Sequence, residues 1–142
     1  RGNNFMKTML RLAAEKDFLS IVADQWGAPT PARLIADVTA TAVAKIRNQL
    51  APSAGVYHLA PKGYTCWHGF AAEIFRISQL ERMDHKLISV KGIKTEEYPL
   101  PAVRPLNSRL NTDKIKHQFD IEMPGWKSQL KLTLEEYASF IR

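Results

Sequence analysis

Residues 19–31 decide the fold class, and they read Leu19-Ser20-Ile21-Val22-Ala23-Asp24-Gln25-Trp26-Gly27-Ala28-Pro29-Thr30-Pro31. The first five residues alternate in character and include β-branched side chains, which predicts a strand that ends at Asp24. Residues 24–29 follow as a loop. Thr30 predicts a helix start, because Thr can cap a helix and Pro31 at the first helical position loses no needed hydrogen bond. A strand, a loop and a helix in this order are typical of an α/β fold.

The helix that begins at Pro31 carries an apolar residue at every fourth position. The members of this stripe are Leu34, Val38, Ala42, Ile46 and Leu50. Ile35 and Val43 widen the stripe, so we expect the helix of residues 31–50 to bury a broad face against a large partner. Residues 52–55 end the helix, and residues 56–59 are predicted to form a short, buried strand.

Helices and strands alternate through the first half of the chain, and helices dominate the second half. One helix is predicted at 4–16, capped by Asn3 or Asn4, and another runs from a Thr65 cap to Leu80 or Met83. A short helix is predicted after the Thr112-Asp113 cap and carries Ile115 and Phe119. The last helix follows Pro124 and has these residues on one face: Trp126, Leu130, Leu134, Tyr137 and Ile141. A further strand is predicted at 87–93, and the prolines of residues 98–105 force an extended, irregular path. No internal repeat or long linker divides the chain.

Composition excludes several classes of protein. The chain has 142 residues, of which 45% are hydrophobic, and a single Cys, so neither a disordered protein nor a disulfide scaffold fits. The net charge of +6 comes from basic residues that are spread singly among acidic ones, which favours a solvated surface over a nucleic-acid site. Charged residues interrupt every apolar stretch, so we expect no membrane segment and a cytoplasmic location. The abrupt start at Arg1 suggests a piece of a longer chain.

The usual catalytic and metal-binding patterns are weak here. Cys66 and His68 lie at a helix start, where a thiol can be activated, but no third group is evident. The four His residues are isolated, and the pairs Glu96/Glu97 and Glu135/Glu136 read as solvated carboxylates rather than an acid–base pair. No Gly-rich phosphate-binding turn occurs.

The most informative segment for binding is Val103-Arg104-Pro105-Leu106-Asn107-Ser108-Arg109-Leu110. Two Arg, an amide and a hydroxyl on a proline-stiffened loop suit the forked recognition of a phosphate or carboxylate. The same side chains could instead fasten the loop to neighbouring carbonyls. The pattern alone leaves both interpretations open.

Several segments together resemble the C-terminal half of the dTDP-4-dehydrorhamnose reductase family. They are residues 24–30 (DQWGAPT), 56–59 (VYHL), Trp67 with Phe70-Ala71, 104–110 (RPLNSRL) and Pro124-Gly125-Trp126, and they occur in the family's order over essentially all 142 residues. The resemblance implies an α/β fold: the C-terminal substrate-binding lobe of an extended short-chain dehydrogenase/reductase, plus the last helix and strand of its Rossmann half. It also implies that residues 31–59 pack on that Rossmann half.

The family is an oxidoreductase family of nucleotide-sugar biosynthesis. The resemblance implies that the parent enzyme reduces the 4-keto group of dTDP-6-deoxy-L-lyxo-4-hexulose to dTDP-L-rhamnose with NADPH or NADH. The redox half needs a Gly-rich turn and a Tyr-x-x-x-Lys motif. Neither is present, since the residues four after the Tyr residues are Pro61, His68, Ala102 and Ile141. We therefore expect no catalytic and no cofactor-binding residue in this chain, and no activity from it alone.

The resemblance also indicates substrate-binding residues. Arg104 is expected to neutralise the diphosphate of the dTDP-sugar, followed by Arg109 and Asn107, with Asn4 and Phe5 on the sugar side. Residues 24–30 either contact the substrate or form a structural corner, and Trp67 is expected in the core. Two departures occur: Val103 stands where the family often has Arg, and Asp120 where it usually has Gly.

The resemblance also implies partners for this chain. The family is associated with magnesium and with homodimers, although no metal ligands can be picked out here. The faces of residues 31–59 would be covered by the missing N-terminal Rossmann half, so we expect the isolated chain to self-associate.

The alternative function is that of a non-catalytic relative similar to the regulatory subunit of methionine adenosyltransferase. A basic nucleic-acid module is a third interpretation, against which the scattered charge argues.

Overall fold

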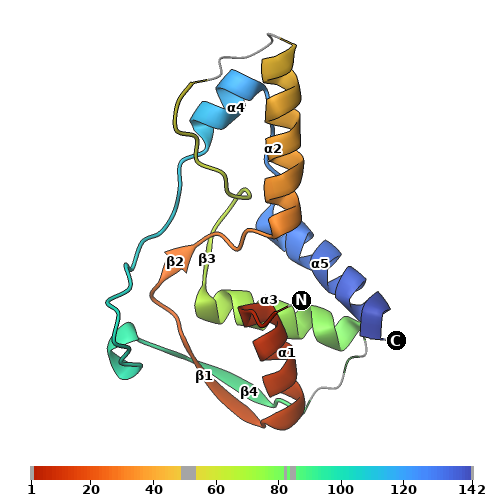
Figure 1. The fold of residues 1–142 in the computed structure, drawn as a ribbon. Helices are drawn as coiled ribbons and strands as arrows, with labels where there is room; N and C mark the ends of the chain where they lie inside the picture. The colour runs from red at the N-terminus through yellow and green to blue at the C-terminus, as the bar shows by residue number, and fades with distance from the viewer. Residues whose placement is uncertain (1, 49–53, 82, 84–85, 142) are drawn as a thin grey trace.

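The computed structural model describes residues 2–48, 54–81, 83 and 86–141 (Figure 1). Its elements in chain order are α1 (Phe5–Glu15), β1 (Phe18–Val22), β2 (Trp26–Gly27), α2 (Ala32–Arg47), β3 (Thr65–Cys66), α3 (Trp67–Leu80), β4 (Ser89–Ile93), a 3-10 turn η1 (Thr95–Glu97), α4 (Asp113–Phe119) and α5 (Trp126–Ile141). In Figure 1, α2 and α4 lie at one end, and α1, α3, β1 and β4 lie at the other. The helices have the positions that the apolar periodicity predicts.

The strands confirm the α/β class. β1 pairs in parallel with β4, in a register that matches Phe18 with Ser89 and Val22 with Ile93. Parallel strands need a long crossover between them, and here the connection contains α2, β3 and α3. β2 pairs antiparallel with β3, so part of the predicted 24–29 loop is a two-residue strand. The short pair was missed because two residues carry no periodicity.

The main hydrophobic core joins α1, α3, α5 and β1. Ala71 and Ile74 of α3 and Leu134 of α5 are completely inaccessible to solvent. They lie in one cluster with the inward faces of α1 and with Ile21 of β1. The predicted apolar face of α3 is thus confirmed, and the last helix contributes its predicted face through Trp126, Leu130 and Leu134.

A second, smaller core forms where α2 meets α4. Leu34 and Val38 of α2 pack with Ile115 and Phe119 of α4 and with Met123. The predicted stripe is therefore confirmed up to Ile46, and Leu50 lies outside the described residues. Ile35 and Val43, however, are 46% and 50% exposed, so the buried face is narrower than predicted.

The predicted strand at 56–59 is wrong. Val56 is 78% exposed, and no described strand pairs with this segment. Side chains hold it instead: the Tyr57 hydroxyl donates to Gln118 Oε1 at 2.6 Å, and the ring packs edge-on against Phe119. Lys114 Nζ also donates to the Val56 carbonyl. A β-branched, apolar run predicts a strand only where a neighbouring edge is available to pair with it.

The N-terminal caps are partly as predicted. Asn4 Oδ1 accepts the Lys7 amide at 2.9 Å, which caps α1. Thr30 does not cap α2, because Pro31 occupies the N-cap position and makes no capping hydrogen bond. The Thr30 hydroxyl donates to the Ala28 carbonyl instead. Proline stands one position earlier than predicted, and this displaces the hydroxyl from the helix end.

Thr65 is not the cap of α3 either. It belongs to β3, and Cys66 takes the N-cap position, where its Sγ accepts the Gly69 amide at 3.4 Å. Thr112 does occupy the N-cap of α4, without a side-chain capping bond. The pairing of β3 with β2 moves the start of α3 beyond Thr65, and no local pattern reports that pairing.

Asp120 ends α4 in the left-handed region, with φ +46°. Glycine adopts that conformation without strain, so an Asp at this position is a less favourable choice for the backbone. Within the described residues, no helix combines the length and the apolar character that a bilayer span requires.

Candidate functional site

The corner that follows β1 anchors one end of a long loop. The Asp24 carboxylate accepts the Thr95 amide at 3.0 Å and the Thr95 hydroxyl at 2.6 Å. These two hydrogen bonds from Thr95, the hydroxyl first, stabilise the charged form and lower the pKa of Asp24 below its ordinary value of 3.8. Asp24 therefore holds the start of the segment that leads to Arg104.

The same corner anchors the other end of the loop. The Trp26 amide donates to the Leu106 carbonyl, and the Ser108 amide donates to the Trp26 carbonyl, both at 2.8 Å. Residues 95–108 are thus tied at both ends to residues 24–26. Arg104 lies between the two ties, on a loop stiffened by its prolines.

Gln25, between these two anchors, is buried and uses both ends of its amide. Its Oε1 accepts the indole N–H of Trp67 at 3.1 Å, and its Nε2 donates to the Thr95 hydroxyl at 3.1 Å. It thereby connects the start of α3 to the loop. Of the two interpretations of residues 24–30, the structural corner is realised at Asp24, while residues 25–30 also line the cavity described next.

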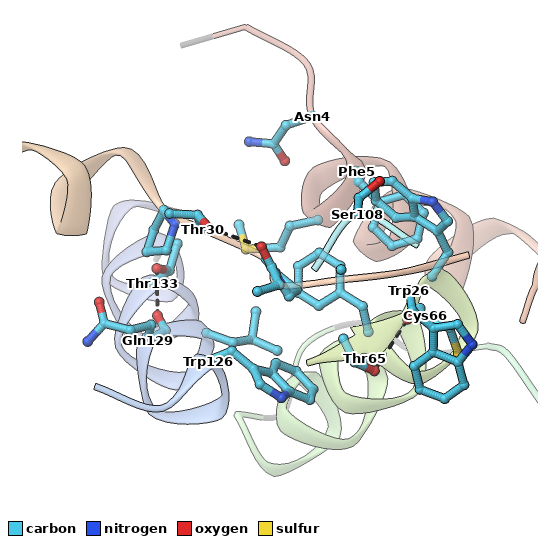
Figure 2. Close-up of a pocket in the computed structure, with 18 of the residues that line it drawn as sticks. Asn4, Phe5, Trp26, Thr30, Thr65, Cys66, Ser108, Trp126, Gln129 and Thr133 are labelled. Atoms are coloured by element: carbon cyan, nitrogen blue, oxygen red, sulfur yellow. Dashed lines mark hydrogen bonds between the residues drawn. The ribbon is translucent and has the colours of Figure 1, made fainter. Parts of the chain in front are cut away.

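A cavity of about 830 Å³ opens beside this corner (Figure 2). Asn4 and Phe5 from the start of α1, Thr65 and Cys66 before α3, and Gln129 and Thr133 of α5 surround it. Other lining residues come from 25–33, with Trp67, Phe70, Arg104, Ser108, Trp126 and Leu130 among the rest. The volume suits a small-molecule ligand. Most of the lining is apolar, with a few polar groups that can orient a ligand.

Charged groups are few in this lining. Arg33 and Glu136 form an ion pair with each other, so their charges largely cancel. Arg104, in contrast, has no ion-pair or hydrogen-bond partner among the residues that the structure describes. Its guanidinium is exposed and free to form a fork on an anionic ligand.

A second cavity of about 560 Å³ adjoins the first. Both cavities are lined by Phe5, Gln25, Trp67 and Arg104, which therefore form the wall between them. The rings of Phe5 and Trp67 pack with their centroids 4.7 Å apart, and Phe5 also stacks on Phe70 at 5.4 Å. Trp67, expected in the core, is half-buried: it packs against the main hydrophobic core and also forms part of this wall.

The predicted site residues are only partly brought together. Asn4, Phe5 and Arg104 line the larger cavity. Asn107 and Arg109 do not line it: Asn107 Oδ1 accepts both the amide and the Nε–H of Arg109, and the guanidinium lies 4.8 Å from the Tyr64 ring centroid. Arg109 is therefore held by the Asn107 side chain and against Tyr64, rather than by the neighbouring backbone carbonyls of the second interpretation.

The weak catalytic candidates are not assembled into a site. Cys66 Sγ accepts a helix amide, while the His68 ring nitrogen lies 3.4 Å from the Val90 carbonyl oxygen, toward β4. Of the acidic pair on the last helix, Glu135 lies near Lys131 and Glu136 pairs with Arg33. Among the described residues, no three His, Cys, Asp or Glu side chains could hold a metal ion.

Sequence reasoning missed several lining residues. Gln129, Thr133 and Glu136 follow Trp126 at helical spacing, so they could have been assigned to the face that meets the cavity. Ser108 and Gln25 belong to segments that the sequence singled out, residues 103–110 and 24–30, but their placement at the cavity depends on contacts between distant segments.

The fold and the cavity together define a class: a ligand-binding lobe of α/β type, with an apolar cavity and, at its edge, an arginine that has no partner among the described residues. Residues 1–139 match the family described as RmlD substrate binding domain. The chain belongs to this family.

Named relatives agree with that assignment. The chain is 46% identical over 136 residues to the dTDP-4-dehydrorhamnose reductase of Salmonella typhimurium and 43% identical to that of Escherichia coli K12, covering 96% of this chain and 45% of each relative. A Bacillus anthracis dTDP-4-dehydrorhamnose reductase, solved in complex with NADP, matches with a TM-score of 0.77 and 33% identity, over 96% of this chain and 44% of that one. The structure of a dTDP-4-dehydrorhamnose reductase ortholog from Clostridium acetobutylicum matches with a TM-score of 0.75 and 35% identity. The chain thus spans about 45% of the length of the curated relatives.

Proposed function

We propose that this chain is the substrate-binding part of a dTDP-4-dehydrorhamnose reductase, an oxidoreductase that converts dTDP-6-deoxy-L-lyxo-4-hexulose to dTDP-L-rhamnose. The observation that carries the proposal is the large apolar cavity with Arg104 at its edge, without a partner in the described part of the chain, in a member of the substrate-binding family. The curated relatives carry the reductase name, which supports this function rather than a regulatory one.

Arg104 has the principal binding role in this proposal. A guanidinium can donate two parallel hydrogen bonds to phosphate oxygens, and Arg104 has no competing partner among the described residues. Arg109 adds positive charge nearby, and Asn107 holds its guanidinium in place. Asn4 and Phe5, at the start of α1, contact the sugar side of the ligand.

The chain supplies substrate binding and not the redox chemistry. None of its Tyr residues precedes a Lys by four positions, and it has no Gly-rich βα turn. The residues present therefore do not fit a dinucleotide site, and the cofactor site and the proton donor belong to another part of the full-length enzyme. The NADP complex of the Bacillus anthracis relative supports NADPH as the reductant of that enzyme. Magnesium finds no ligand set in the described part of this chain.

The proposal extends to the partner surfaces. Ile35 and Val43 of α2 are half-exposed, which supports the packing of residues 31–59 on an N-terminal Rossmann half. A homodimer and a cytoplasmic location are part of the same proposal.

Calorimetric titration with dTDP tests the binding role. We expect the chain to bind dTDP weakly, and Arg104→Gln to weaken binding by about tenfold, the size of a lost charge-assisted hydrogen bond. Arg47→Gln removes the same charge from the exposed end of α2 and is the matched control. Absence of dTDP binding, or an unchanged affinity in Arg104→Gln, would overturn the proposal. So would oxidation of NADPH by this chain alone in the presence of the keto-sugar.

A further inference from the structure

Four side chains form a hydrogen-bond relay with a single direction. The indole N–H of Trp67 can only donate, so the amide of Gln25 must present its oxygen to it. The Gln25 amide nitrogen then faces Thr95 Oγ1 and donates to it. The Thr95 hydroxyl, having accepted that bond, donates its own hydrogen bond to the Asp24 carboxylate. Every member has one available role, so the orientation of the whole relay is determined.

The relay joins the two parts of the proposed binding site. At one end stands Trp67, which with Phe5 forms the wall of the larger cavity. Toward the other end, next to the terminal Asp24, Thr95 begins the loop that carries Arg104. Gln25 is 9% exposed, so water does not readily replace its two hydrogen bonds.

We propose that Gln25 and Thr95 are positioning residues, which couple the Trp67 wall of the cavity to the segment bearing Arg104 and so preorganise the site for a nucleoside diphosphate. This inference rests on the proposed function. Thr95 acts through others, because it does not line the larger cavity, although it lines the second one. Gln25 lines both cavities, so Thr95 is the member of the pair that separates positioning from direct contact. Sites that bind through a few oriented groups depend on the second layer of residues that holds them.

Two substitutions interrupt the relay at different points. Gln25→Met keeps the length of the side chain and removes both hydrogen bonds, which leaves the indole N–H of Trp67 without its acceptor. Thr95→Val keeps the shape and removes the hydroxyl between Gln25 and Asp24. We expect each variant to bind dTDP roughly tenfold more weakly, the order of a lost buried polar contact. Thr95→Ser retains the hydroxyl and should stay within about threefold of the unsubstituted chain.

The matched control is Gln118→Met. It loses one side-chain hydrogen bond, from the Tyr57 hydroxyl, in the region of α4 and away from both cavities. Calorimetric titration with dTDP and thermal unfolding are measured for all variants. The control should keep its affinity for dTDP within about twofold, whatever its melting temperature.

The results separate positioning from other roles. If Thr95→Val binds dTDP as tightly as the unsubstituted chain, Gln25 acts at most by direct contact and the relay is refuted. If Gln118→Met weakens binding as much as Gln25→Met, the effect is general destabilisation and the inference also fails. If the unsubstituted chain does not bind dTDP, the proposed function itself is wrong.

Discussion

Replacing Leu134 with alanine should destabilise the fold strongly, because this side chain is in the centre of the main core. Leu134 lies on α5 and is completely inaccessible to solvent, in the same cluster as Ala71 and Ile74 of α3. These neighbours are equally buried, so they have little freedom to collapse into the space that a shorter side chain leaves. The matched control is Leu132→Ala on the same helix, where the side chain is 40% exposed.

The magnitude follows from burial. Leu→Ala removes about three methylene equivalents at roughly 0.8 kcal/mol each, or about 2.4 kcal/mol of transfer free energy. The residual cavity adds to this, which places the total near 3–5 kcal/mol, the upper part of the range for buried leucines. For a chain of this size, such a loss lowers Tm by about 10–15 °C. Leu132→Ala should cost about 1 kcal/mol or less.

Urea unfolding, followed by circular dichroism and by tryptophan fluorescence, measures both changes. The helix-propensity effect of Leu→Ala is common to the two variants and cancels in their difference. The free energies of unfolding should therefore differ by at least about 2 kcal/mol. A difference below about 1 kcal/mol would refute the packing of α5 against α3 described above.

Three further predictions concern pH, backbone strain and association. The pKa of Asp24 is lower in the folded state than its unfolded value of 3.8, so its hydrogen bonds with Thr95 stabilise the fold above pH 3.8. This stabilisation is lost as the pH falls through the folded pKa. The difference in urea midpoint between the unsubstituted chain and Asp24→Asn should therefore shrink below that pH. Asp120→Gly should raise the free energy of unfolding by up to about 1 kcal/mol, because φ at this position is +46°; a lower urea midpoint would contradict this. The isolated chain should self-associate through the half-exposed Ile35 and Val43 of α2. Glutamate at either position should reduce this association in sedimentation velocity. A strictly monomeric unsubstituted chain at micromolar concentration would count against this prediction.

The local pattern of apolar residues was sufficient to predict a helix or strand where that element buries a single face. The alternation in β1 and the helical spacing of apolar residues in α1, α3 and α5 predicted elements that the structure confirms within a few residues. The Asn4 cap was also predictable, because a cap uses a side chain and a backbone amide only three residues apart.

Pattern failed where the outcome depends on a distant partner. Residues 56–59 have the composition of a strand and yet are held by α4 through Tyr57. The pairing of β2 with β3 moves the cap of α3 from Thr65 to Cys66. Neither outcome is encoded within a few residues of the segment concerned.

The residues of the candidate site also fall into those that the sequence predicted correctly and those whose contacts only the structure shows. Arg104, Asn4 and Phe5 were expected from the family resemblance, and the structure places all three around one cavity. Arg109 was expected beside them, but its Nε–H bonds to Asn107 and its guanidinium lies over Tyr64. Residue type alone cannot say which of two nearby arginines remains unpaired.

The amino-acid sequence by itself determined the α/β class, the positions of the helices and the family, because these depend on short-range periodicity and on motifs in a fixed order. Only the tertiary structure decided how the binding site is held. Asp24 and Gln25 reach Thr95 across about seventy residues of chain, and Trp26 ties the far end of the same loop. Contacts of that sequence separation form only when β1 and β4 pair and bring their ends together, and the position of Arg104 follows from that pairing.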